Sequence, residues 1–167
     1  MTSMHTIIGF LRDQGIEWDQ VDPNTIVAVL PGTHKQRISV SLSAGASALV
    51  INAFVARHPD ENHEAVYRWL LERNRRQFVV AFSLDHLGDI YLTGRIPLAH
   101  LTESEFDAIL GSVLEYADNS FNSILELGFA SAIAKEWTWR TSRGLPTDNL
   151  AAFRHLATGN SEQGSGK

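Results

Sequence analysis

The chain of 167 residues contains no cysteine. Disulfide bonds, thiolate nucleophiles and cysteine-ligated zinc are therefore excluded. No apolar run approaches the length of about 20 residues that a membrane-spanning helix needs. The first residues also lack the basic stretch and the long apolar run of a signal peptide. Together these absences favour a soluble protein of the cytoplasm, with no membrane partner.

Basic residues are in the minority, with 14 lysines and arginines against 19 aspartates and glutamates and a formal net charge of −5. A general nucleic-acid binder needs a dominant positive field to neutralise phosphates. No nucleic-acid partner is therefore expected. A regulator that did bind nucleic acid would need Arg75, Arg76, Arg95, Arg140 and Arg143 on one face.

The sequence also lacks the local motifs that identify many enzymes. The seven histidines include no pair spaced four apart on one helix, and the zinc-protease motif HExxH is absent. The nucleophile motif GxSxG, the phosphate-binding motif GxxxxGK and the dinucleotide motif GxGxxG are missing too. No catalytic residue, metal ligand or cofactor is predicted, and the chain is not expected to be an enzyme.

What the chain does contain is a strong helical pattern between Leu101 and Arg140. Apolar residues recur there at steps of three and four, which predicts a long amphipathic helix. Thr102 and Glu105 have the spacing of a capping box at its start, and Gly128 is expected to break it. An apolar stripe of this width needs a broad apolar surface to pack against.

The preceding residues supply the strands of such a surface. They predict a five-stranded antiparallel sheet packed by helices, an α+β fold in the order αβββαββα with extra C-terminal helices. A short run at Ile16–Val21 stays open as a further strand. The strand-like runs are Ile26–Leu30, Arg37–Ser43, Ala46–Arg57, Phe78–Leu84 and Ile90–Ile96.

Composition predicts a single domain over residues 1–158, long enough to bury a core. The last residues, 159–167, are small and polar. They are expected to form a disordered tail.

Positive charge concentrates around the start of the predicted hairpin, at Arg73, Asn74, Arg75, Arg76 and Arg95. Such a cluster could hold an anionic ligand or an acidic segment of a partner. The simpler interpretation, which we favour, is that some of these side chains cap the preceding helix and pair with nearby carboxylates.

Polar residues spaced four apart follow one line of the long helix at Asp118, Asn122 and Glu126. They could bond to the sheet or line a partner site, and structural use is the favoured interpretation. Trp139 falls off the apolar stripe and lies beside Arg140, a combination that often anchors an interface.

The segment RNRRQFVVAFSLDHLGDIYLTGRIP and the following LTESEFDAILGSVLEYADNSFNSILELGF resemble the YbjN-domain family. The hairpin pattern D-x-x-GDIYLTGR-P and the helix pattern D-x-x-FN-x-I are the best matches, and the resemblance covers roughly Ile16 to Phe153. Members are bacterial proteins described as regulators of sensory transduction. The family's fold is similar to that of type III secretion chaperones, which are usually homodimers that bind unfolded segments of secreted proteins.

The resemblance therefore implies a regulator or chaperone-like adaptor that binds another protein, with a homodimer as one expected state. An alternative is a small-ligand sensor or an unrecognised enzyme with a pocket near Arg95 and Asp118. The candidate partner-binding or ligand-binding residues are Asn74, Arg76, Arg95, Asp118, Asn122, Trp139 and Arg140.

Overall fold

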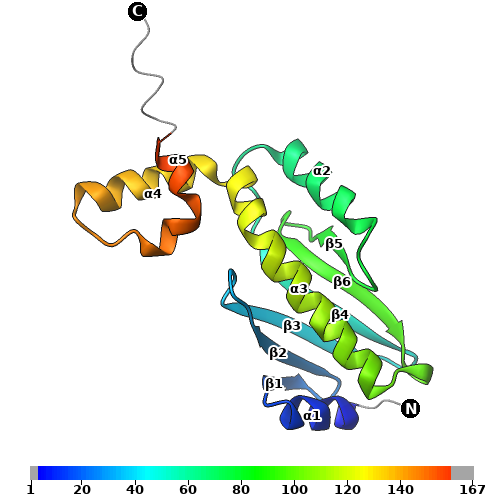
Figure 1. Cartoon of the computed structure of the whole chain (residues 1–167). Coiled ribbons are helices and arrows are strands. Elements are labelled where there is room, and N and C mark those ends of the chain that lie inside the picture. Colours follow the sequence, from blue (N-terminus) through cyan, green and yellow to red (C-terminus); the bar gives the residue numbers. More distant parts are fainter. Residues whose placement is uncertain (1–3, 159–167) are drawn as a thin grey trace, which may run out of the picture.

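The computed structural model describes residues 4–158 and shows a six-stranded sheet crossed by one long helix (Figure 1). All neighbouring strands are antiparallel, in the spatial order β1-β2-β3-β4-β6-β5. The strands are β1 (Glu17–Asp22), β2 (Thr25–Pro31), β3 (Arg37–Ala44), β4 (Ala48–Ala56), β5 (Ala81–Leu84) and β6 (Ile90–Pro97). The helices are α1 (Met4–Asp13), α2 (His63–Asn74), α3 (Glu103–Gly128), α4 (Ala130–Ser142) and α5 (Arg154–Thr158), with short 3-10 helices η1 (Leu98–His100) and η2 (Asp148–Phe153).

One face of the sheet carries the main core. Burial alternates along the central strands, as it must when successive side chains point to opposite faces. The buried side chains of the strands form one cluster with those of α1, α2 and α3. All three helices therefore cover the same face, and within residues 4–158 no helix of this cluster covers the opposite face.

Specific contacts set both ends of α3. At the start, Thr102 and Glu105 form the predicted capping box, with the Glu105 backbone N–H donating to Thr102 Oγ1 over 3.2 Å. At the end, the helix stops at Gly128, as predicted. A Cβ at Gly128 would lie 2.9 Å from the Cβ of Pro59, so only glycine allows α3 to approach that segment so closely.

The predicted five-stranded sheet is wrong by one strand. Residues 17–22 form the edge strand β1, which pairs with β2 and raises the number of strands to six. Trp18 is its only residue that is not fully exposed. A strand that buries so little shows almost no hydrophobic alternation, which explains why its pattern in the sequence is weak.

The first arm of the predicted hairpin is shorter than the sequence indicates. β5 begins at Ala81 rather than at Phe78. Val79 has a φ of 66°, and the Val80 N–H bonds back to the Phe78 carbonyl over 2.7 Å. The chain therefore turns sharply before the strand, which leaves Phe78 and Val79 exposed.

The C-terminal helices form a smaller packing unit beyond the end of α3 (Figure 1). Phe129, Ile133, Leu150 and Phe153 are buried together there. These are the extra helices that the sequence predicts. That residues 1–158 behave as one domain stays a prediction, and the predicted tail at 159–167 lies outside the described residues.

Replacement by alanine should change the stability of the protein in opposite directions at two glycines of α3. At Gly111, which is exposed with nothing within 4 Å of an added Cβ, alanine should stabilise the protein by about 0.5–1 kcal/mol, because it lowers the entropy cost of the helix. At Gly128, alanine should destabilise it, because the new methyl group would meet Pro59 and Val66. Urea unfolding of both variants measures the difference, and equal shifts of the same sign would contradict this account of the α3 terminus.

Candidate partner-binding surface

Three arginines gather at the C-terminal end of helix α2: Arg73, Arg75 and Arg76. Val66 and Leu70 are buried against the core, and the half-buried Trp69 packs near Phe82, with 6.4 Å between ring centroids. This packing fixes how the helix is rotated. Arg73 in its last turn, and Arg75 and Arg76 just beyond the helix, therefore extend into solvent.

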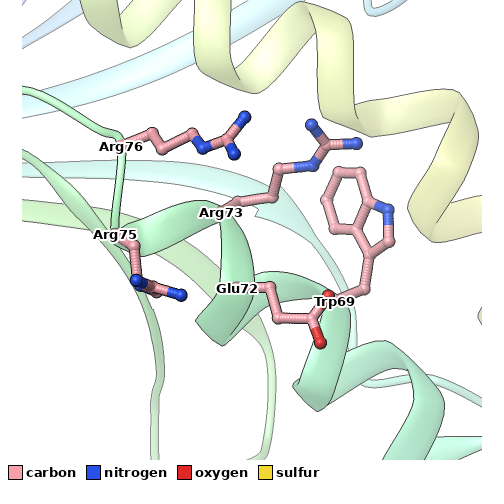
Figure 2. Close-up of a pocket in the computed structure, with 5 residues that line it drawn as sticks. All are labelled: Trp69, Glu72, Arg73, Arg75 and Arg76. Carbon is pink, nitrogen blue, oxygen red and sulfur yellow. The ribbon is translucent and has the colours of Figure 1, made fainter.

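These side chains surround a pocket of about 450 Å³, which we call the arginine pocket, lined by Trp69, Glu72, Arg73, Arg75 and Arg76. Figure 2 shows Arg73 extending along the Trp69 ring, with Arg76 on the same side. The Arg73 guanidinium carbon lies 4.5 Å from the ring centroid. A cation at this distance over an indole is held by the ring's negative face. Arg73 is thereby positioned without a carboxylate.

The charge of the arginine pocket is not neutralised within the protein. Among residues 4–158, the ion pairs within 4.0 Å include none of the three arginines. Three guanidinium groups stand against the single carboxylate of Glu72, which leaves two excess positive charges. The interpretation favoured from the sequence has two parts, and the pairing of these three arginines with nearby carboxylates is not found among the described residues. Their placement at the C-terminus of α2 still suits the helix dipole.

A smaller hollow of about 220 Å³ continues the arginine pocket toward α3 and shares Trp69, Arg73 and Arg76 with it. Gln77 lines this hollow, and its buried Oε1 has no hydrogen-bond partner among the described residues. A buried amide oxygen without a donor is costly.

Exposed apolar side chains gather around the same segment. Eight large apolar residues are exposed in the described structure, and five of them fall between residues 71 and 87. Such a concentration within one short segment differs from leucines scattered along the chain, and it makes the segment a candidate interaction surface. The five are Leu71, Phe78, Val79, Leu84 and Leu87. We call these residues and the arginine pocket together the α2–β5 surface.

Asn74, one of the predicted binding residues, is committed to the fold. Its side-chain NH₂ donates to the Phe82 carbonyl over 3.1 Å, and its Oδ1 accepts from the Phe82 N–H over 2.7 Å. The amide thus occupies the outer edge of β5 where another strand would otherwise pair. Partner binding by simple extension of the sheet is blocked at this residue.

Asp118 lies on α3 and fastens the loop between β2 and β3. Its Oδ1 accepts the backbone N–H groups of His34 over 2.7 Å and Lys35 over 2.9 Å. Burial alone would raise the pKa of Asp118, but these hydrogen bonds together with His34 hold it below its ordinary value. Its place in the structure is that of a clamp between two segments.

The remaining candidates do not converge with Asp118. Arg95 pairs in register with Val50, and both lie on the sheet face opposite α3. Arg140 bonds to Glu136 over 2.7 Å on α4, where Trp139 is 46 % exposed. Arg95 and Asp118 therefore do not line a shared pocket, which the alternative drawn from the sequence requires. Asn122 is half-buried on α3, one helical turn from Asp118.

The features that the sequence did not indicate are Trp69 as a support for Arg73 and the exposure of Leu71, Phe78 and Leu87. Phe78 belongs to a run that the sequence predicts as a strand, Phe78–Leu84, and this prediction gives no sign of its exposure. Such exposure can be suspected from the sequence where a short helix or turn has apolar residues on every side. A single core cannot bury all of them.

A model of the family described as "Putative bacterial sensory transduction regulator", YbjN, matches residues 3–126. The chain belongs to the YbjN family. The match extends from α1 into α3 and includes the whole sheet, so α4, η2 and α5 lie outside it. The resemblance drawn from the hairpin and helix motifs is thus confirmed.

Close relatives of this YbjN protein occur in mycobacteria. It is 53% identical over 131 residues to the uncharacterised protein ML2442 of Mycobacterium leprae, covering 78% of this chain and 71% of the other. It is 51% identical over 134 residues to the uncharacterised protein Rv0487 of Mycobacterium tuberculosis, covering 80% and 73%.

Solved structures share the fold at lower identity. YbjN from E. coli aligns with a TM-score of 0.54 at 14% identity, covering 72% of this chain and 89% of that one. A chain of the ExsC–ExsE complex aligns with a TM-score of 0.52 at 24% identity, covering 71% and 94%. At these identities the likeness establishes the α+β architecture with its antiparallel sheet.

Within residues 4–158, no helix is long and apolar enough to cross a membrane. In the same residues, no three or more histidine, aspartate or glutamate side chains come together in a way that could hold a metal ion.

The clamp formed by Asp118 predicts a pH-dependent stability. Because its folded pKa lies below the unfolded value, its stabilisation is present above the unfolded pKa and is lost as the pH falls through the folded pKa. Asp118→Asn should therefore unfold more easily than the wild type at neutral pH, by about 1–3 kcal/mol. The difference should shrink at pH values below the ordinary range of a carboxyl, about 4.

Urea unfolding at neutral and acidic pH measures this difference. Asp107→Asn, an exposed carboxylate on the same helix, is the control and should change little at either pH. A stability difference for Asp118→Asn that stays constant with pH would contradict the role of its carboxylate.

Proposed function

We propose that this YbjN protein is a non-enzymatic regulator or adaptor that binds a segment of another protein through the α2–β5 surface. The observation that carries the proposal is the coincidence of unpaired arginines with most of the exposed large apolar side chains in one short stretch of chain. Cations and apolar groups together fit a partner segment that alternates acidic and apolar residues.

The fold is consistent with this proposal. One of the solved structures with a similar fold is a complex of two proteins, ExsC and ExsE. The proposal includes the finer features that the sequence implies: a chaperone-like fold of the type III secretion kind, a homodimer and a cytoplasmic location. The other candidate residues, Arg95, Asn122, Trp139 and Arg140, line neither the arginine pocket nor the hollow beside it and are not part of the proposed contact.

Binding at this surface should have a small entropy cost for the protein. Arg73 is already held over Trp69, so its side chain loses less freedom when a partner arrives than a fully mobile arginine would. Leu71 and Phe78 are exposed in the free protein, and covering them removes apolar surface from water. The charges then favour acidic partners over basic ones.

Photocrosslinking in living bacteria tests the proposal. Benzoylphenylalanine placed at position 71 should give discrete adducts with another protein, because the Leu71 side chain is 66 % exposed at the proposed contact. Position 21 on β1 is the matched control, since Val21 is also 66 % exposed but lies at the opposite edge of the sheet.

Changing Arg73 and Arg76 to glutamate should strongly weaken the adducts formed from position 71, because the partner's acidic residues would then be repelled. Adducts of equal strength from positions 71 and 21, or adducts unaffected by the charge reversals, would contradict the proposal.

A further inference from the structure

Another hollow lies between the sheet and the C-terminal helices, and it shares no lining residue with the arginine pocket. It has a volume of about 460 Å³, within the range typical of small-molecule sites. We call it the Lys35 groove. Its walls are mostly apolar, and the side chains that matter here are Lys35, Phe54, Phe121, Phe129, Ile133 and Leu150.

Lys35 enters the groove between two aromatic rings. Its Nζ lies 5.2 Å from the centroid of Phe54 on β4 and 5.0 Å from that of Phe121 on α3. Both distances are within the range of a cation–π contact. Burial lowers the pKa of Lys35, as expected for an ammonium group that has lost part of its water.

The position of Lys35 is fixed by the backbone. Its N–H and that of His34 both donate to Asp118, which ties the loop to α3. Gly32 permits this arrangement, because a Cβ there would lie 2.6 Å from the Asp118 Oδ1. A cation held in place before a ligand arrives binds it with a smaller entropy cost.

The other charges that line the groove are already neutralised. Arg57 stacks on Phe129 at 4.4 Å and pairs with Asp60 at 2.7 Å. Glu136 pairs with Arg140 at 2.7 Å. Among the described residues Lys35 forms no ion pair within 4.0 Å, so it is the one lining charge left without a partner.

We propose that the Lys35 groove binds a small amphipathic carboxylate, with the carboxylate on Lys35 and an apolar body along Phe121, Phe129 and Ile133. A single desolvated cation beside an apolar wall is complementary to a single negative charge on an apolar molecule. Such a ligand would contact the sheet on one side and the C-terminal helices on the other. This site is separate from the proposed protein contact, and either can fail without the other.

Decanoate and its neutral counterpart 1-decanol are suitable probes, because they share one alkyl chain and differ in charge. The wild-type protein should bind decanoate at least about tenfold more tightly than decanol. A charge-assisted contact in a partly buried site gives a difference in affinity of this size. Calorimetry measures the affinities. Nitrogen-15 NMR locates the site, with shifts expected at Lys35, Phe54 and Phe121.

Lys35→Gln and Lys35→Met should remove the preference for decanoate, while Lys35→Arg should retain it. Lys135→Gln removes an exposed lysine of α4 that does not line the groove, and it should bind as the wild type does. The proposal is overturned if decanoate does not bind the wild type below its critical micelle concentration. It is also overturned if decanoate binds Lys35→Gln as tightly as the wild type, or if the NMR shifts fall elsewhere.

Discussion

The packing of the α3 apolar stripe across the sheet determines where the other parts of this protein can lie. Ile109, Val113 and Ile124 are buried against the strands, and each such side chain contributes about 1.5–3 kcal/mol when removed from water. At its far end α3 meets the segment before α2, where Gly128 contacts Pro59 and its carbonyl accepts the N–H groups of Asp60 and Glu61. The position of α2, and with it that of the arginines, follows from this junction.

Two different uses of positive charge result from that arrangement. The arginines at the end of α2 are exposed and stand near exposed leucine and phenylalanine side chains, which suits a large, flexible partner. Lys35 is half-buried between two rings in a groove of limited volume, which suits a small one. In both places no carboxylate of the described residues lies within ion-pair distance, so a bound anion would supply the compensating charge.

Local patterns predict the parts of the fold that are stabilised locally. The capping box at Thr102 and the turn before β6 both depend on residues a few positions apart. The polar residues Asn74 and Asp118 could be recognised as notable, but their roles could not. Asn74 bonds to a residue eight positions away, and Asp118 bonds to residues 83 and 84 positions away. The edge strand β1 and the arginine pocket likewise depend on distant packing rather than on local sequence.

The central claim is that residues 71–87 form the surface on which another protein docks. Hydrogen–deuterium exchange on the protein alone and on its complex with a partner identified by crosslinking tests this claim most directly. The account predicts slower exchange on binding in the last turn of α2 and in the segment through β5, with little change in β1. Unchanged exchange over residues 71–87, together with protection of β1 or of the open face of the sheet, would contradict it.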